Sequence, residues 1–147
     1  MMMLNTSPAL ACALDSVENG EVAEVERWLE TSQVAVDDVS PDGSTMLTTA
    51  VIEGQCGVVR LLLARGADPN LALDDGGETP LFLADDPRII DLLAAHGADV
   101  DDAGEGGETA LMEKARACDL DAVRALLRNG AEPSLRDGHG RTALDAA

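Results

Sequence analysis

The segments "GETALMEKA" (residues 107–115) and "AVRALLRNGAEP" (residues 122–133) decide the fold of this chain. Thr109 precedes an apolar run, where its hydroxyl can bond the unpaired N–H groups of a first helical turn. Gly130 follows a Leu-rich run, where a residue in the left-handed conformation can end a helix. Val123, Leu126 and Leu127 recur at i, i+3 and i+4, the spacing of one apolar helix face. The pattern predicts two short helices, the second of which buries one face.

The same pattern recurs along the chain with a period near 33 residues. Similar helix starts lie at residues 43–50, 77–84 and 140–147, and similar helix ends at residues 58–70 and 89–100. The capping threonines are 34, 30 and 33 residues apart: Thr45, Thr79, Thr109 and Thr142. The glycines at the helix ends are 31 and 33 residues apart: Gly66, Gly97 and Gly130. Because one helix pair is too small to bury its own apolar face, neighbouring pairs are expected to stack.

These motifs closely resemble the ankyrin repeat family, and in particular its small members of the bacterial type. The resemblance covers the chain from about residue 8 and implies an all-α solenoid of stacked helix-turn-helix units with short finger hairpins. It implies about four repeats plus a partial C-terminal unit within a single domain, residues 1–147. The expected units are residues 8–38 (an N-terminal cap), 39–72, 73–101, 102–135 and 136–147. In the cap, Trp28 occupies the position of Leu62 and is expected to be largely buried.

Composition restricts the core and the partners. Hydrophobic residues make up 46% of the chain, but with one Phe, one Trp and no Tyr the core must be aliphatic. The formal net charge of -18 repels nucleic acid phosphates and anionic lipid headgroups, so neither is an expected partner. A basic protein or a cation would be attracted. The competing interpretation is that the charge serves solubility or life in a salty cytoplasm.

The three cysteines indicate a reducing compartment. Cys12, Cys56 and Cys118 are odd in number, are far apart and form no CxxC motif, so they predict neither a disulfide framework nor a zinc site. Cys12 is expected to be a small buried helix residue. The sequence has no stretch of about 18 apolar residues that could span a bilayer. We therefore expect a cytoplasmic protein.

The third repeat is shorter than its neighbours. Its capping threonine and helix-ending glycine are 18 residues apart, against 21 in the second and fourth repeats. The loss falls between Ala84 and Arg88, and Pro87 suits the first turn of the second helix, with Asp85 or Asp86 as its N-cap. Lys114 of the fourth repeat stands where the other repeats have a small alanine. The shortening is expected to let its ammonium group reach Asp85 or Asp86; alternatively, the repeat is a simple length variant and Lys114 extends to solvent.

Signals for catalysis or cofactor binding are weak. His96 and His139 have no Ser or Cys nucleophile in an elbow motif beside them. The segment "GHGRTA" (residues 138–143) follows no apolar strand, so it does not predict dinucleotide binding. Acidic runs at residues 37–42, 74–78 and 101–108 would line up as a ridge of carboxylates, but none has the spacing of an EF-hand. No enzyme activity, cofactor or metal site is predicted.

The resemblance implies a protein–protein interaction module that uses its fingers and concave helical face. Carried over by position, the usual contact residues of the family correspond here to Glu18, Asn19, Pro41, Asp42, Ser44, Ile52, Glu53, Asp75, Glu78, Glu105, Glu108 and Arg116. Seven of these twelve residues are acidic, so we expect the partner to present a basic protein surface. We also expect the chain to be a monomer. Two alternatives stay open: an acidic module that responds to divalent cations, and a structural fragment of a longer protein.

Overall fold

The computed structural model describes residues 7–31, 33–72 and 78–146 of the chain, which forms two compact parts, Met1–Asp68 and Pro69–Ala147. The first part contains α1 (Pro8–Glu18), α2 (Val22–Glu30), α3 (Met46–Ile52) and α4 (Cys56–Ala64). The second contains α5 (Pro80–Leu83), α6 (Pro87–Ala95), a 3-10 turn η1 (Glu105–Gly107), α7 (Ala110–Arg116), α8 (Leu120–Arg128) and α9 (Ala143–Ala146). The predicted helical repeat fold is confirmed.

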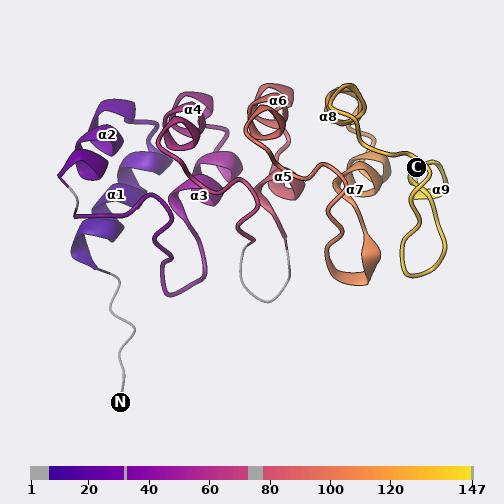
Figure 1. Cartoon of the computed structure of the whole chain (residues 1–147), viewed down its shortest axis with the longest axis horizontal. Coiled ribbons are helices and arrows are strands. Elements are labelled where there is room, and N and C mark those ends of the chain that lie inside the picture. The colour runs from indigo at the N-terminus through magenta and orange to yellow at the C-terminus, as the bar shows by residue number, and fades with distance from the viewer. Residues whose placement is uncertain (1–6, 32, 73–77, 147) are drawn as a thin grey trace, which may run out of the picture. The chain divides into compact units, whose positions relative to one another are not determined.

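Within each part, helices of the same rank pack side by side. In the first part α1 packs on α3 and α2 on α4; in the second, α7 packs on α5 and α9, and α6 on α8 (Figure 1). The contacts between pairs are aliphatic, as the composition predicts. Fully buried examples are Val17, Val25, Val59, Leu62, Ile89, Ile90, Leu93 and Leu126. Successive pairs thus share one core within each part.

The threonines begin the helices as the sequence predicts. The Thr45 hydroxyl accepts the N–H of Thr48, whose own hydroxyl accepts the N–H of Thr45, so α3 starts with a reciprocal capping box. Thr79 and Thr109 cap α5 and α7 in the same way, each accepting a backbone N–H three residues further on. At the other end of the pairs, the glycines after α4, α6 and α8 all have φ between 89° and 94°, the left-handed conformation expected at a helix end.

A finger hairpin precedes each capping threonine in the described residues around α3, α7 and α9. Antiparallel bridges join Val39 to Thr45 in the second finger (residues 39–45) and Ala103 to Thr109 in the fourth finger (residues 103–109). In the fifth finger (residues 136–142) the N–H of Asp137 donates to the carbonyl of Arg141, 2.9 Å away. No extended strand occurs within residues 7–31, 33–72 and 78–146.

One prediction about the first repeat needs correction. Cys12 is exposed on α1 rather than buried. Trp28 is largely buried as expected, although part of its surface remains in solvent. The indole is much larger than the leucine that fills the same position in later repeats, and large rings are rarely enclosed completely. Its α2 packs on the second helix of the following repeat, α4.

The shortened third repeat is confirmed. Its first helix, α5, has four residues, whereas α3 and α7 have seven each. The chain leaves the helix at Ala84, whose ψ is 122°, and Asp86 caps α6 by accepting the N–H of Arg88 at 2.9 Å. Pro87 takes the first helical position, where its missing N–H costs nothing.

Lys114 pairs with the shortened junction, as the sequence predicts. Its side chain is 6% exposed, and its ammonium lies 2.6 Å from Asp85 Oδ1 and 3.2 Å from Glu113 Oε2. Burial alone would lower the pKa of Lys114, but the hydrogen bond to Asp85 and the charge of Glu113 outweigh it and raise the pKa above its ordinary value. The lysine is therefore charged and buried between α7 and the third repeat.

Within the described ranges, every helix is too short or too polar to cross a lipid bilayer.

Candidate protein-binding site

Eleven of the twelve expected contact residues lie in the described part of the chain, and all eleven reach solvent. Asp75 lies outside the described residues. Ser44 and Glu108 are partly buried, and the other nine are exposed. Ile52 and Glu53, at the end of α3, are exposed without lining either of the two grooves that hold other members of the set. Surface position alone does not define a site, so the grooves are the more informative feature.

A groove of about 360 Å³ in the first part brings Glu18, Pro41 and Asp42 together. Helix α1 contributes Glu18 with three further residues along its length, Ala11, Leu14 and Asp15, and the second finger contributes Pro41 and Asp42 with Ser40. The carbonyl of Glu18 accepts a 2.9 Å hydrogen bond from Gln55 Nε2, which ties this end of α1 to the following repeat. Asn19, the residue after α1, and Ser44 lie outside the lining of this groove.

Asp42 is held in the charged form by its own finger. Its carboxylate accepts hydrogen bonds from the hydroxyls of Ser40 and Ser44 and from the N–H of Ser44, at 2.6 Å and 3.1 Å for the two Ser44 contacts. These hydrogen bonds lower the pKa of Asp42 from 3.8 to about 2. The bond from the Ser40 hydroxyl has the largest effect, followed by the bonds from the hydroxyl and the N–H of Ser44. The finger therefore presents a negative charge beside a face of α1 that carries both apolar side chains, Ala11 and Leu14, and further carboxylates.

A second groove, of about 330 Å³, lies in the Pro69–Ala147 part and brings Glu78, Glu105 and Glu108 together. It is also lined by Phe82 of α5 and by the backbone of Gly104 and Gly106. Phe82 is the only phenylalanine in the chain and remains partly exposed. Three glutamates from two successive repeats thus line the same groove as one aromatic ring. Sequence reasoning had selected the three glutamates, but it gave no reason to include Phe82.

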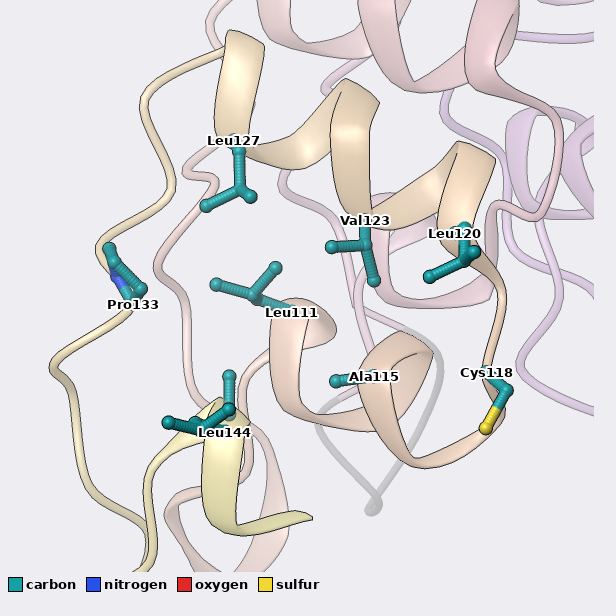
Figure 2. A pocket seen from close by; sticks show the side chains of 9 residues that line it. Leu111, Ala115, Cys118, Leu120, Val123, Leu127, Pro133 and Leu144 are labelled. Carbon is teal, nitrogen blue, oxygen red and sulfur yellow. The ribbon is translucent and has the colours of Figure 1, made fainter. Parts of the chain in front are cut away.

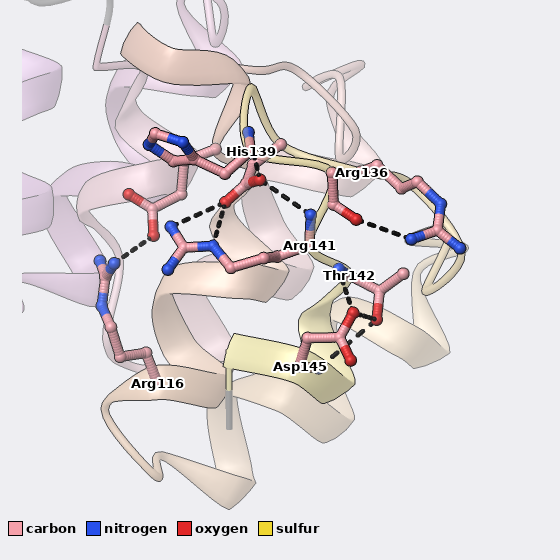
Figure 3. A network of polar contacts seen from close by, with 9 residues as sticks. Arg116, Arg136, His139, Arg141, Thr142 and Asp145 are labelled. Carbon is pink, nitrogen blue, oxygen red and sulfur yellow. Dashed lines mark hydrogen bonds and ion pairs between the residues drawn. The ribbon is translucent and has the colours of Figure 1, made fainter.

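Arg116 belongs to the same region but is already engaged. Its guanidinium lies 2.7 Å from Glu108 Oε1 (Figure 3). The pair links the end of α7 to the fourth finger and offsets one of the three glutamate charges. A cation arriving from a partner would have to compete with Arg116 for Glu108.

The fifth finger was not selected from the sequence, and its charge differs from that of the others. It carries Arg136, His139 and Arg141 around Asp137 (Figure 3). The Asp137 carboxylate accepts from the N–H groups of Arg141 and His139 and from Arg141 Nε, at 2.8–3.0 Å. The N–H of Arg141, the largest of these influences, lowers the pKa of Asp137 below its ordinary value. Arg141 stands where earlier fingers have Ser44, Glu78 and Glu108, and this change of charge before the capping threonine was the available signal.

The fourth and fifth fingers touch through glycines. The N–H of Gly138 donates to the carbonyl of Gly106 at 2.6 Å, and a Cβ placed on Gly138 would lie 2.9 Å from that oxygen. Gly107 has φ 74°, and a Cβ there would lie 3.1 Å from the Gly138 nitrogen. Only residues without a side chain allow this approach.

No group of three or more His, Cys, Asp or Glu side chains within the described ranges is arranged to hold a metal ion. The cation-responsive alternative therefore has no donor cluster among these residues. What the structure does offer is a set of exposed fingers and two grooves presented by a packed helical scaffold.

Stacked helix pairs with protruding fingers define a class of repeat proteins built as binding scaffolds. Models of the ankyrin repeat match residues 10–103, as three copies, and residues 106–138, as one further copy. The chain belongs to the ankyrin repeat family, whose repeats mediate protein–protein interaction.

Three known proteins are similar in sequence to this chain. Human SH3 and multiple ankyrin repeat domains protein 2 is 41% identical over 87 residues, which are 56% of this chain and 5% of that protein. Mouse protein phosphatase 1 regulatory subunit 27 is 35% identical over 98 residues, 65% of this chain and 63% of that protein. Bovine cyclin-dependent kinase 4 inhibitor B is 36% identical over 108 residues, 71% of this chain and 82% of that protein. The chain thus spans less than two thirds of the length of the first two.

Proposed function

We propose that this chain is a non-catalytic binding module that captures a basic segment of a partner protein. The observation that carries the proposal is the groove that Glu78, Glu105 and Glu108 line together with Phe82. A Lys or Arg side chain has an apolar stem and a charged tip, so the stem can pack on the ring while the tip meets a carboxylate. The groove offers both surfaces at one place.

The charge of the whole chain supports the same partner. A net charge of -18 attracts basic proteins over a distance set by ionic strength and speeds their approach. The groove at Glu18, Pro41 and Asp42 offers a second place where carboxylates adjoin apolar side chains. Because the pKa of Asp42 is about 2, its charge persists at any physiological pH.

The related proteins support binding rather than catalysis. One is named as a regulatory subunit and another as an inhibitor, and both names describe proteins that act by contacting another protein. The three free cysteines support a reducing location, and we propose the cytoplasm.

The test compares two variants of equal charge. Glu78→Gln, Glu105→Gln and Glu108→Gln together neutralise the groove, while Glu21→Gln, Glu24→Gln and Glu30→Gln neutralise three acidic residues of the first repeat. A fluorescent Arg/Leu-rich peptide serves as probe, with an Asp-for-Arg version as its negative control, and anisotropy gives the dissociation constant. Loss of three partly exposed ion pairs should weaken binding about tenfold in the groove variant and less than about twofold in the other. Equal weakening in both would show that only the total charge matters and would overturn the proposed site.

A separate variant tests the contribution of the Phe82 ring. Phe82→Leu keeps an apolar side chain but removes the ring face, so it should weaken an Arg-containing probe by a few-fold at about 0.05 M salt and remain visible at about 0.5 M. An effect that disappears at the higher salt would assign the whole interaction to long-range charge.

A further inference from the structure

Two asparagine–glycine pairs occur in the chain, and each lies at the end of a helix. Asn19 and Gly20 follow α1 in the first repeat. Asn129 and Gly130 follow α8, whose last turn carries Leu127 beside the apolar groove drawn in Figure 2. An asparagine before glycine is prone to lose its side-chain amide without an enzyme, because glycine has no Cβ to keep its nitrogen away from the preceding side chain.

The reaction needs only water. The glycine nitrogen loses its proton to solvent and forms a bond to Cγ of the asparagine, the bond from Cγ to the amide nitrogen breaks, and that nitrogen leaves as ammonia with a proton from water. A succinimide ring results, and water then opens it at one of its two carbonyl carbons. One opening gives aspartate, and the other gives isoaspartate, in which the main chain runs through Cβ and Cγ. In both products a neutral amide has become a carboxylate.

The backbone does not distinguish the two sites. Asn19 has φ -79° and ψ -6°, and Asn129 has φ -90° and ψ 11°. The glycines that follow have φ 71° and 93°. Each glycine N–H donates to the carbonyl of the residue three positions before it, at 3.0 Å for Gly20 and 3.1 Å for Gly130. A difference in reactivity between the two sites must therefore arise from the side chains.

The two asparagine side chains are held very differently. Asn129 is partly buried, and its Nδ2 donates to Asp91 Oδ1 at 2.7 Å and to the carbonyl of Ala125 at 2.8 Å. Asn19 is exposed, and its side chain forms no hydrogen bond with any residue in the described ranges. The Asn129 side chain cannot turn toward the nitrogen of Gly130 until both bonds break, whereas the side chain of Asn19 changes rotamer freely.

We propose that Asn19 is a site of spontaneous deamidation in the folded protein, and that Asn129 is protected from the same reaction by its contact with Asp91. The reaction at Asn19 does not depend on the proposed binding function. It does act on the candidate binding surface, because Asn19 is one of the expected contact residues and its conversion adds a carboxylate next to Glu18.

Isoaspartate at this position also alters the contact between the first and second repeats. Gln55 Nε2 donates to the carbonyl of Glu18 at 2.9 Å, and the side-chain amide of Gln55 packs directly on Gly20. An extra carbon atom in the main chain between these two contacts moves them apart. The modification therefore changes both the charge of the first repeat and its attachment to the second.

Peptide mapping by mass spectrometry measures both sites in one sample. The chain is incubated at mildly alkaline pH, once in native buffer and once in concentrated guanidinium chloride, and is then digested at acid pH. In the folded chain Asn19 should convert at least about tenfold faster than Asn129, since two hydrogen bonds must break before the Asn129 side chain can turn. In the unfolded chain the two rates should agree within about threefold, because neither side chain is then held. Equal rates in the folded chain, faster conversion at Asn129, or no conversion at Asn19 while the unfolded sample reacts would each overturn the proposal.

Matched variants test the protection of Asn129. Asp91→Ala removes its carboxylate partner, so it should raise the rate at Asn129 about fivefold and leave the rate at Asn19 unchanged. Asp121→Ala removes an equal charge from α8, where Asp121 pairs with Arg124, and should change neither rate. Far-UV circular dichroism and the melting temperature verify that both variants are folded. An unchanged rate at Asn129 in the folded Asp91→Ala variant would overturn the protective role of this contact.

Discussion

The second and fourth repeats are equally long from capping threonine to helix-ending glycine, yet the fourth departs from the repeat pattern at two positions that the second keeps. Ala50 is fully buried in α3, and the equivalent position in α7 is Lys114, also buried. Gly54 follows α3 with φ 68°, and the equivalent Cys118 follows α7 with φ 58°. One repeat conforms to the pattern at both positions, and the other departs from it at both.

The difference at Lys114 is explained by the neighbouring repeat rather than by the fourth repeat itself. The shortened junction after α5 places Asp85 2.6 Å from the ammonium group. A charged side chain is therefore accepted in a buried position where the adjacent repeat supplies its counter-ion. Departures from a repeat pattern are best interpreted in pairs, one in each of two adjacent repeats.

The largest effect is expected when the second repeat is given the buried lysine of the fourth. Ala50→Lys would place an ammonium where the side chain is fully buried, beside a preceding repeat whose first helix is not shortened. An unpaired buried charge should reduce the free energy of unfolding by about 3 kcal/mol or more, measured by urea denaturation. Ala11→Lys on an exposed face of α1 is the control, with an expected change within about 0.5 kcal/mol. A loss below about 1 kcal/mol at Ala50 would show that this position accepts a lysine in any repeat.

The next largest effect is expected when the counter-ions of Lys114 are removed. The Lys114 side chain is 6% exposed, whereas that of Asp85 is 81% exposed. Asp85→Asn with Glu113→Gln should therefore lower the unfolding free energy by about 2 kcal/mol, while Lys114→Met should change it by less than about 1 kcal/mol.

Combining these substitutions provides the control for that prediction. In the triple variant with Asp85→Asn, Glu113→Gln and Lys114→Met, no buried charge remains without a counter-ion. It should recover most of the stability lost in the double variant. A triple variant as unstable as the double variant would attribute the loss to the junction of α5 and α6 rather than to the buried ammonium.

A smaller effect sharpens the comparison at Cys118. A residue with a side chain pays a cost in the left-handed conformation that glycine does not pay. Cys118→Gly should therefore raise the unfolding free energy by about 0.5–1 kcal/mol. Cys118→Ala removes the thiol but keeps the side-chain carbon, so it should give no gain. Equal gains from both variants would point to the thiol instead of the backbone.

The smallest effect concerns the fingers of the same two repeats. The second finger is shaped by the Asp42 carboxylate, whereas the equivalent position of the fourth finger is Gly106, with φ 73°. Since the folded pKa of Asp42 is lowered from 3.8 to about 2, its contribution to stability is present above pH 3.8 and is lost as the pH falls toward 2. Asp42→Asn should lower the melting temperature slightly at pH 6 and flatten its fall between pH 4 and pH 2. An unchanged acid profile would exclude Asp42 as a contributor.

Local signals in the sequence predicted most of the fold. A capping hydroxyl and a left-handed glycine act within a few residues, so Thr45, Thr109, Gly66 and Gly130 could be placed without knowledge of the tertiary structure. Counting residues between these signals also located the shortened junction. Lys114 could be assigned to Asp85 or Asp86 because its position directed it toward that junction, and the structure selects Asp85.

The candidate site was less predictable because it depends on distances between repeats. Glu78, Glu105 and Glu108 were selected by position, but their arrangement around Phe82 follows from how α5 and the fourth finger pack. The degree of burial of Trp28 depends on what flanks α2, which the apolar stripe does not specify. The fifth finger was missed because contact positions were transferred only to complete repeats.

The glycine contact between the fourth and fifth fingers has a consequence for conformational entropy. The bond from Gly138 to Gly106, at 2.6 Å, restrains two exposed loops at their tips before any partner arrives. Ordering a loop on binding costs free energy that a restrained loop has largely lost already. Glu105 and Glu108 are presented from one of these loops, so a segment that binds them gains its contacts with little further ordering of the protein.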